Sequence, residues 1–424
     1  MLSIVVPPLN SVHVFIKCSF QCLPGGCHLL VEFRNQQVAE FHRALLFHSL
    51  RVLSSLYCLM LIISNEDIES VLTLDVAFKA LERAYLDQAG GRAVNRPRSD
   101  LYLPGVHDGS IYAFKSMEGG LVESKVVALR LNSDVIRWED REKRVIKQKV
   151  PAAPGKKWVG LIQLFSAETG EPLAIFPDGV IQRIRVAVTS ALAAREMARK
   201  DASVLAVFGS GWQAGAHIPA FCAVRDIKKV NVFSPTKDNR EKFAQKMEQL
   251  VGIPVVPVPS SATAAKDADI LVAATNAITP VISAAWLRSG VHATCVKDCE
   301  FDDETLRRAD RIVIHSRNFA PENYIAGCGD RKISAHDPVD FIRGNKSTAV
   351  GDASPFWIDS PELKDVIAGT VPGRTSPEEA TCFINNIGLG IQFAAVGHAV
   401  YLQAKAKGLG KEIPTDWFLE SVHP

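Results

Sequence analysis

The chain has 424 residues, of which 47% are hydrophobic and 22% are charged. Lysine and arginine total 48 against 46 aspartate and glutamate residues, so the formal net charge is +2. This balance is typical of a globular protein and argues against a nucleic-acid-binding protein, which would carry a clear basic excess. The length favours two domains with a cleft between them.

Cysteine usage and hydropathy bear on location. The nine cysteines are odd in number and widely scattered, which does not match a disulfide framework and favours a reducing cytoplasm. No uncharged apolar run reaches the length of about 18 residues that a spanning helix needs, because His48 and Arg51 interrupt residues 45–64. We therefore expect a cytoplasmic protein without a membrane segment.

Residues 1–59 form an atypical N-terminal extension, with four of the nine cysteines and no helical or strand period. The spacing of Cys18, Cys22, Cys27 and His28 does not fit a structural zinc site, so no metal is predicted. At Met60 a helix-capping pattern begins. Two readings of the extension stay open: a mis-assigned start with Met60 opening the working protein, or a targeting segment.

From Met60 onward the first predicted elements are helical. Thr73 is expected to cap a helix that buries apolar residues at three- and four-residue spacing, among them Ala77, Leu81 and Tyr85, and that ends at Gly90. From residue 98 to 177 short β-type runs predict a mixed sheet. The charged stretch 138–157 is expected to interrupt that sheet as a solvated insertion or loop.

The second half of the chain alternates apolar strands with helices. A helix over 185–199 leads into the strand 204–208, and five further apolar runs follow, at 230–233, 255–256, 270–274, 292–296 and 311–314, with a helical stretch over 239–250. This alternation predicts an α/β fold: a Rossmann-type doubly wound parallel sheet plus a discontinuous α+β substrate and dimerisation domain. A long apolar helix over 382–407 is expected to return to that first domain. The expected domains are 60–198 with 381–424, and 199–380.

The pattern Gly209-x-Gly211-x-x-Ala214 follows a predicted buried strand and opens a predicted helix. Gly209 permits a tight turn, Gly211 lets the backbone approach a pyrophosphate, and Ala214 keeps the helix close to the sheet. The amides of the helix N-terminus attract phosphate. The context favours a dinucleotide-binding loop over a simple strand-to-helix turn.

The end of the next strand indicates which dinucleotide is bound. An NAD enzyme commonly has an acid there for the ribose hydroxyls, whereas this chain has Ser234 and Thr236, followed by Lys237 and Arg240. Hydroxyl groups and positive charge favour a 2′-phosphate, so NADP(H) is the preferred cofactor. Asp238 keeps NAD(H) possible.

From Met60 to its end the chain resembles the ornithine cyclodeaminase and mu-crystallin family. The resemblance rests on residues 185–194 leading into the 209–214 loop, on Val296-Lys-Asp298-Cys, and on Asn385-Asn-Ile-Gly-Leu-Gly390. It implies a homodimer that transfers a hydride at the α-carbon of an amino or imino acid. Its small-molecule substrate would then be an amino acid or an imine.

The resemblance also implies roles for individual residues. Arg98, Lys115 and Arg185 are expected to bind the substrate carboxylate, while Asp298 and Lys125 are expected to manage protons and charge in catalysis. The cofactor-binding residues implied are Gly209, Ser210, Gly211, Trp212, Gln213, Ser234, Thr236, Asn239, Thr275, Asn276, Val296 and Asn386.

Two departures from the family pattern leave the substrate open. Ser116-Met-Glu stands where cyclodeaminases have Asn-Gly-His-Pro, and Val186 replaces a threonine. The main expectation is an NAD(P)-dependent imine reductase or amino-acid dehydrogenase. The alternatives are a cyclodeaminating lyase that releases ammonia with bound NAD, and an NADPH-dependent small-ligand binding protein like mu-crystallin.

Overall fold

A computed structural model describes residues 17–23, 26–32, 59–105, 110–141, 144–277, 279–321, 324–327, 357 and 359–421. The chain divides into two compact units, 1–59 with 414–416 and 60–413 with 417–424. In the described part of the chain, no helix is long and apolar enough to cross a membrane.

The first unit contains an antiparallel hairpin of β1 (Lys17–Leu23) and β2 (Gly26–Glu32). The sequence showed no strand period here, so this hairpin was not predicted. The prediction that Cys18, Cys22, Cys27 and His28 form no metal site lies outside the residues whose side chains are described.

The second unit begins with two capped helices, as the sequence predicts. Ser64 and Asp67 form a reciprocal capping box at α2 (Asn65–Val71). The Thr73 hydroxyl accepts the Val76 N–H at the start of α3 (Leu74–Ala89), and Gly90 ends that helix. The predicted face of α3, with Leu81 and Tyr85, is buried.

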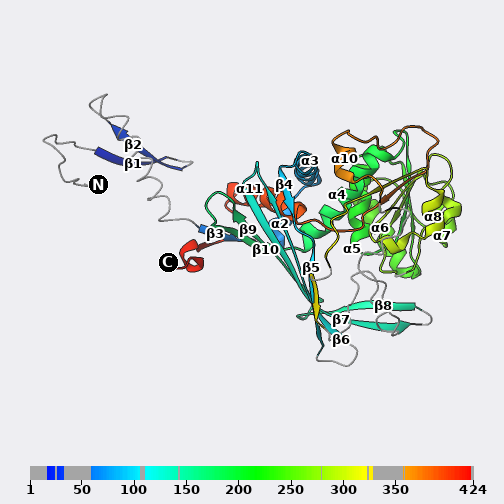
Figure 1. Cartoon of the computed structure of the whole chain (residues 1–424), viewed down its shortest axis with the longest axis horizontal. Coiled ribbons are helices and arrows are strands. Elements are labelled where there is room, and N and C mark those ends of the chain that lie inside the picture. Colours follow the sequence, from blue (N-terminus) through cyan, green and yellow to red (C-terminus); the bar gives the residue numbers. More distant parts are fainter. Residues whose placement is uncertain are drawn as a thin grey trace. The chain divides into compact units, whose positions relative to one another are not determined.

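A ten-stranded mixed sheet follows, with the order β17-β5-β6-β7-β9-β10-β3-β19, β4 beside β6 and β8 beside β7 (Figure 1). Neighbouring strands from β5 to β10 are antiparallel, while β10–β3 and β17–β5 are parallel. The strands are β3 (Leu59–Ile62), β4 (Ala93–Asn95), β5 (Ser99–Pro104), β6 (Ser110–Leu121), β7 (Val126–Arg141), β8 (Arg144–Val150), β9 (Val159–Ser166), β10 (Pro172–Pro177), β17 (Ile325–Gly327) and β19 (Lys411–Pro414).

The expectation of a loop over 138–157 is wrong for most of its length. Strand β7 continues to Arg141, and β8 pairs antiparallel with it over seven residue pairs (Figure 1). The charged residues therefore belong to a β-hairpin that extends from the sheet. Their high charge reduces strand propensity, but cross-strand pairing decides the conformation of a hairpin more than propensity does.

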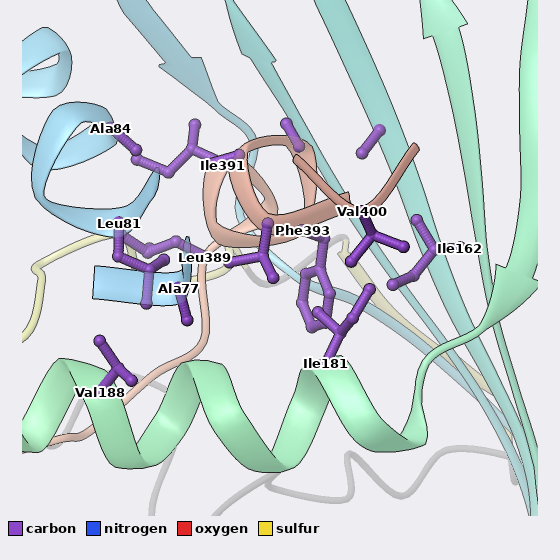
Figure 2. Packing of buried hydrophobic residues seen from close by; sticks show 14 of the residues in the cluster. Ala77, Leu81, Ala84, Ile162, Ile181, Val188, Leu389, Ile391, Phe393 and Val400 are labelled. Carbon is purple, nitrogen blue, oxygen red and sulfur yellow. The ribbon is translucent and has the colours of Figure 1, made fainter. Parts of the chain in front are cut away.

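One face of this sheet packs on helices. Helix α11 (Gly390–Ala406) lies against β6, β7 and β9 and against α2, α3 and α4 (Gly179–Met197). Figure 2 shows Phe393 of α11 and Ile181 of α4 pointing toward each other, with Ile162 of β9 nearby. Because α11 has protein on nearly all sides, its apolar residues are not confined to one stripe.

The second sheet has seven strands, all parallel, in the order β13-β12-β11-β14-β15-β18-β16. Leu205 and Val207 of β11 pack toward α4, α5 and α6, and Ala206 and Phe208 pack toward α7 and α8. Helices on both faces make this a doubly wound Rossmann-type sheet, as predicted.

Its strands are β11 (Val204–Phe208), β12 (Lys229–Phe233), β13 (Val255–Pro257), β14 (Ile270–Ala273), β15 (His292–Cys295), β16 (Arg311–Ile314) and β18 (Thr381–Ile384). The remaining helices are α5 (Trp212–Cys222), α6 (Lys237–Val251), α7 (Ser261–Ala265), η1 (Ala284–Trp286), η2 (Asp298–Glu300), α8 (Asp303–Arg308), α10 (Leu363–Ile367) and η4 (Thr415–Phe418).

Two predicted boundaries need correction. The expected helix over 382–407 is a strand, β18, followed by a short connection and then α11. Residues 381–384 therefore lie in the parallel sheet and not in the returning helix. Helix α4 starts at Gly179, six residues before the predicted start at Arg185. At 381–384 a short apolar run concealed the change of element, because periodicity does not separate a buried strand from a buried helix.

Candidate active site

The loop at 209–214, which the sequence predicts to bind a dinucleotide, has the expected turn geometry. Gly209 directly follows β11 with φ +119°, a conformation that favours glycine, and its N–H donates to the Phe233 carbonyl at 2.8 Å. A Cβ on Gly209 would lie 2.3 Å from the carbonyl oxygen of Ala274. This glycine is therefore required by the turn itself.

Gly211 has a different role. It is the N-cap of α5, and a Cβ built on it would meet no atom within 4 Å. The open space lies at the N-terminus of an eleven-residue helix, and the first amides of that helix lack intrahelical partners. The open space and the unpartnered amides fit a bound pyrophosphate.

The candidate adenosine contacts lie at the end of β12. Ser234 is buried, and its hydroxyl accepts from Ser210 at 2.9 Å, so the two predicted residues are joined. The Arg240 guanidinium donates to the Ser234 carbonyl at 3.0 Å, which holds this cation beside the loop. Thr236 and Asn239 are exposed at the start of α6.

A residue that the sequence did not reveal organises the carboxyl edge of the sheet. Glu300 is fully buried, and it accepts from the Thr275 N–H and hydroxyl at 2.8 and 2.6 Å and from the Val296 N–H at 3.0 Å. It also accepts from the Lys297 N–H at 3.2 Å. One carboxylate thus ties the loop after β14 to the loop after β15, and it positions the predicted residues Thr275 and Val296. Asn276, next to Thr275, is exposed.

Asp298 lies three residues beyond β15, in η2, at the edge where a doubly wound sheet binds its ligand. Its side chain is half-buried, and Oδ1 accepts the Cys299 N–H at 2.9 Å. It is therefore held near the backbone while remaining accessible to a ligand.

The loop after β18 runs along the same edge. The Asn385 N–H donates to the Cys295 carbonyl at 3.2 Å, and its side-chain amide donates to Ser190 of α4 at 3.1 Å. Asn386 binds the backbone of His315 and Ser316 beyond β16. This loop therefore connects the β15 edge, close to Asp298, with helix α4.

Two predicted substrate-binding cations meet on the ten-stranded sheet. Arg98 forms a two-point ion pair with the buried Asp100, at 2.7 and 2.9 Å, and Lys115 lies 3.8 Å from the same carboxylate. The charges of Arg98 and Lys115 lower the pKa of Asp100 although burial alone would raise it. Both cations are thus already partly compensated within the protein.

Arg130 belongs to this cluster, and the sequence analysis missed it. Its guanidinium binds the Asp178 carboxylate at 2.6 and 2.8 Å, and Asn132 donates to the same carboxylate at 3.4 Å. Lys115 and Asn132 are cross-strand partners, which share a face of the sheet. The two-residue alternation Arg130–Asn132–Asp134 was the signal that could have revealed a polar stripe on β7.

Arg185, on α4, completes the cluster. Two guanidinium groups lie over the ring of Phe393. The Cζ of Arg185 is 5.1 Å from the ring centre, and the Cζ of Arg130 is 5.3 Å from it. Arg185 is 4% exposed, and its hydrogen bonds go to the side-chain oxygens of Gln182 and Gln392. Burial, together with the positive charge of Arg130, lowers the pKa of Arg185 to about 9.

Lys125 is not part of this cluster, which corrects the prediction. It lies in the turn between β6 and β7 with φ +51°, its side chain is 60% exposed, and it pairs with the equally exposed Glu168. Arg130 lies four residues after Val126, the first residue of β7, and thus about 14 Å along the strand at a rise of about 3.4 Å per residue. The lysine was predicted from a local motif, whereas the strand register places Arg130 beside the buried Asp178.

The cation cluster and the sheet edge meet at Arg185. A Cβ on Gly388, in the loop after β18, would lie 2.8 Å from Arg185 Nη2. Since β18 pairs with β15, Arg185 and Asp298 both border the carboxyl edge of the parallel sheet. The structure therefore brings together the predicted dinucleotide loop, the half-buried carboxylate of Asp298 and a buried arginine.

Comparison with known proteins agrees with this geometry. The chain is 31% identical over 265 residues to a Delta(1)-pyrroline-2-carboxylate reductase of Bacillus cereus, covering 61% of this chain and 75% of that protein. It is 28% identical over 358 residues to the alanine dehydrogenase of Archaeoglobus fulgidus, covering 83% and 98%.

A solved structure, Thermococcus litoralis Delta(1)-pyrroline-2-carboxylate reductase in complex with NADH and L-proline, superposes with a TM-score of 0.66 at 28% identity, covering 84% of this chain and 100% of that one. An archaeal alanine dehydrogenase dimer with bound NAD gives 0.64 at 26% identity, covering 84% and 99%. The family model for ornithine cyclodeaminase/mu-crystallin matches residues 60–408. The chain therefore belongs to the ornithine cyclodeaminase/mu-crystallin family, and it is an NAD(P)-dependent oxidoreductase of that family.

Proposed function

We propose that the protein reduces a 2-imino acid to the 2-amino acid, or runs this reaction in reverse, by hydride transfer at the α-carbon. The observation that carries the proposal is Arg185, a buried cation without an acidic hydrogen-bond partner among the described residues, at the ligand-binding edge of the sheet. A substrate carboxylate would supply the missing negative charge. Relatives that act on imino or amino acids include pyrroline-2-carboxylate reductase and alanine dehydrogenase.

The residues of the site would divide the work. Arg185 would hold the substrate carboxylate, and Asp298 would exchange a proton with the substrate nitrogen. Arg98 and Lys115, with Arg130 in place of Lys125, would form the polar wall of the substrate pocket on the sheet. The bound nicotinamide supplies the hydride or accepts it.

The same proposal assigns the dinucleotide to the loop at 209–214 and the carboxyl edge of the parallel sheet. Gly209, Ser210, Gly211, Trp212 and Gln213 would hold the pyrophosphate. The other proposed contacts are Ser234, Thr236, Asn239, Thr275, Asn276, Val296 and Asn386. Trp212 is 54% exposed, and the Arg183 guanidinium lies over its ring, with Cζ 5.4 Å from the ring centre.

NADP(H) is the proposed preferred form of the cofactor. Two observations support this preference. Arg240 is held against the Ser234 carbonyl, and residues 233–237 contain no carboxylate. Replacing Arg240 by alanine should raise the KM for NADPH about tenfold and leave that for NADH nearly unchanged, since about one charge-assisted contact to phosphate is lost. Lys242→Ala, an exposed cation on the same helix, is the control. Equal use of both cofactors by the unchanged protein would contradict the preference.

We also propose that the ten-stranded sheet with α2, α3 and α11 forms a substrate and dimerisation domain, split in sequence by the Rossmann domain, and that the protein is a homodimer. A dimer in a related archaeal alanine dehydrogenase supports this assembly. Light scattering of the purified protein measures it directly.

The reaction itself is tested by following nicotinamide absorbance with Δ1-pyrroline-2-carboxylate, iminosuccinate, and pyruvate with ammonia. Substrate-dependent oxidation that falls about 100-fold or more in Asp298→Asn, the usual scale for loss of a proton-transfer group, is the expected result. Ammonia release from an amino acid without net cofactor turnover would identify a cyclodeaminating lyase instead. Cofactor binding without any turnover would identify a binding protein.

A further inference from the structure

The cations of the site differ in how their charges are compensated. Arg98 is paired with Asp100 and Arg130 with Asp178, each through two close contacts to a carboxylate. Arg185 is held by two neutral amides instead, those of Gln182 and Gln392. A neutral acceptor fixes the direction of a guanidinium group and leaves its charge available to a ligand.

The two glutamines accept hydrogen bonds from different nitrogens of the guanidinium. Gln182 Oε1 accepts from Nε at 3.2 Å and from Nη2 at 2.7 Å, and Gln392 Oε1 accepts from Nη1 at 2.9 Å. Arginine has five N–H donors, so these bonds use three of them. Among the described residues, no acceptor is found for the other two, one on each terminal nitrogen, and two such donors match a carboxylate.

Turning the Gln392 amide around would point its NH2 group at two N–H donors, Arg185 Nη1 and the Leu389 backbone, and both of those bonds would be lost. Gln392 Nε2 donates to the hydroxyls of Tyr85 and Thr189 at 2.9 and 2.7 Å, and its Oε1 also accepts the Leu389 N–H at 2.9 Å. The side chain is fully buried, and the Tyr85 hydroxyl is bonded in turn to His315 at 2.9 Å. The oxygen is therefore kept toward Arg185 by residues from three separate elements.

The contacts next to Gln392 support the same geometry. Phe393 places its ring under the Arg185 guanidinium, and Figure 2 shows this ring in the core between α11 and α4. Thr189 donates its hydroxyl to the Arg185 carbonyl at 2.8 Å, which fixes the backbone of the same arginine. Orientation of Arg185 thus depends on residues that do not themselves reach the sheet edge.

We propose that Gln182 and Gln392 are positioning residues that orient Arg185 while leaving its charge uncompensated, so that the carboxylate of the substrate completes the ion pair. The proposal rests on the function proposed above. According to this proposal, substrate affinity depends on both amides being uncharged. A carboxylate at either position would still offer an acceptor oxygen to Arg185, but it would add a negative charge.

The test replaces each glutamine by glutamate, in Gln182→Glu and Gln392→Glu. Each variant keeps an oxygen toward Arg185 but supplies an internal negative charge that competes with the substrate. We expect the KM for the imino acid to rise about tenfold or more, with a much smaller change in kcat and an unchanged Kd for NADPH or NADH. Gln403→Glu, an exposed residue on α11, adds the same charge to the same helix and should change none of these values.

A second measurement does not depend on turnover. Pyrrole-2-carboxylate, an unreactive planar carboxylate, is titrated calorimetrically into the protein with bound oxidised cofactor, and its Kd should rise about tenfold or more in both glutamate variants. Gln182 is partly exposed, so its variant tests the proposal even where the buried Gln392→Glu fails to fold.

The outcomes separate the two proposals. Wild-type affinity for the probe in a folded glutamate variant, or no binding of the probe by the wild type, overturns the role of the two amides. Probe binding that weakens in the variants while no imino acid is reduced overturns the proposed reaction and leaves the positioning role intact.

Discussion

At the scale of single residues, Gly209 and Gly211 of the same loop are needed for different reasons. Gly209→Ala should lower the free energy of unfolding by about 1–3 kcal/mol, because φ is +119° and the added methyl meets the Ala274 carbonyl. Gly211→Ala should leave stability nearly unchanged, since the methyl enters open space. It should nevertheless weaken dinucleotide binding because that space is the proposed place of the pyrophosphate.

Denaturant unfolding measures the first effect, and fluorescence titration with NADPH and NADH measures the second. Gly252→Ala is a useful comparison: it also has positive φ, +71°, but lies at the end of α6, with no neighbour within 4 Å of an added Cβ. It should cost stability without affecting the cofactor. Normal dinucleotide affinity in Gly211→Ala would place the pyrophosphate elsewhere.

A second residue-scale prediction contrasts Arg130 with Lys125. Arg130→Met leaves Asp178 buried without its main partner and should lower the free energy of unfolding by about 3–5 kcal/mol. Lys125→Ala keeps the Cβ and removes an exposed ion pair, so stability should change by less than about 1 kcal/mol and catalysis should remain.

Thermal unfolding and steady-state kinetics of both variants provide the measurement. The double variant Arg130→Met with Asp178→Leu removes both charges and should recover part of the lost stability. A large loss of kcat in Lys125→Ala, with normal folding, would return the lysine to the site and contradict the exposed position described above.

At the scale of elements, the carboxyl ends of β14 and β15 depend on one acid. Glu300→Gln places an N–H₂ group among N–H donors, so at least one bond to Thr275, Val296 or Lys297 is lost. We expect a decrease of about 1–3 kcal/mol in the free energy of unfolding. Weaker dinucleotide binding should accompany it, because both loops border the proposed nicotinamide site.

Chemical denaturation and cofactor titration check this prediction, with Glu304→Gln, an exposed acid on α8, as the matched control. If Glu300→Gln were as stable as the control variant, the loops would be held by their own backbone and not by the carboxylate.

At the scale of the whole molecule, the family match begins at residue 60, and the division between the two compact units falls between Leu59 and Met60. The pairing of β3 with β10 uses Leu61 and Ile62, which lie beyond that division. A protein that starts at Met60 should therefore keep its melting temperature, cofactor affinity and activity. Calorimetry of both forms is the measurement, and a clearly lower melting temperature of the shorter form would show that residues 1–59 contribute to the fold.

Local patterns were sufficient wherever neighbouring residues decide the structure. The caps at Ser64 and Thr73, the turn at Gly209 and the alternation of strands and helices are all set within a few residues. The sequence by itself therefore determined the Rossmann-type sheet, the glycine turn at 209–211 and the position of Asp298 beyond β15.

The tertiary structure decided what depends on register and on long-range contact. The apolar residues of β18 fit a helix as well as a strand, and the charged residues of the β7–β8 hairpin fit a loop. The pairing of β18 with β15 and of β8 with β7 decides both cases. Arg130 enters the site and Lys125 does not, because the pairing of β6 with β7 fixes which side chains reach the buried face. Glu300, Gln182 and Gln392 were not predicted, since each acts through partners whose proximity exists only in the folded chain.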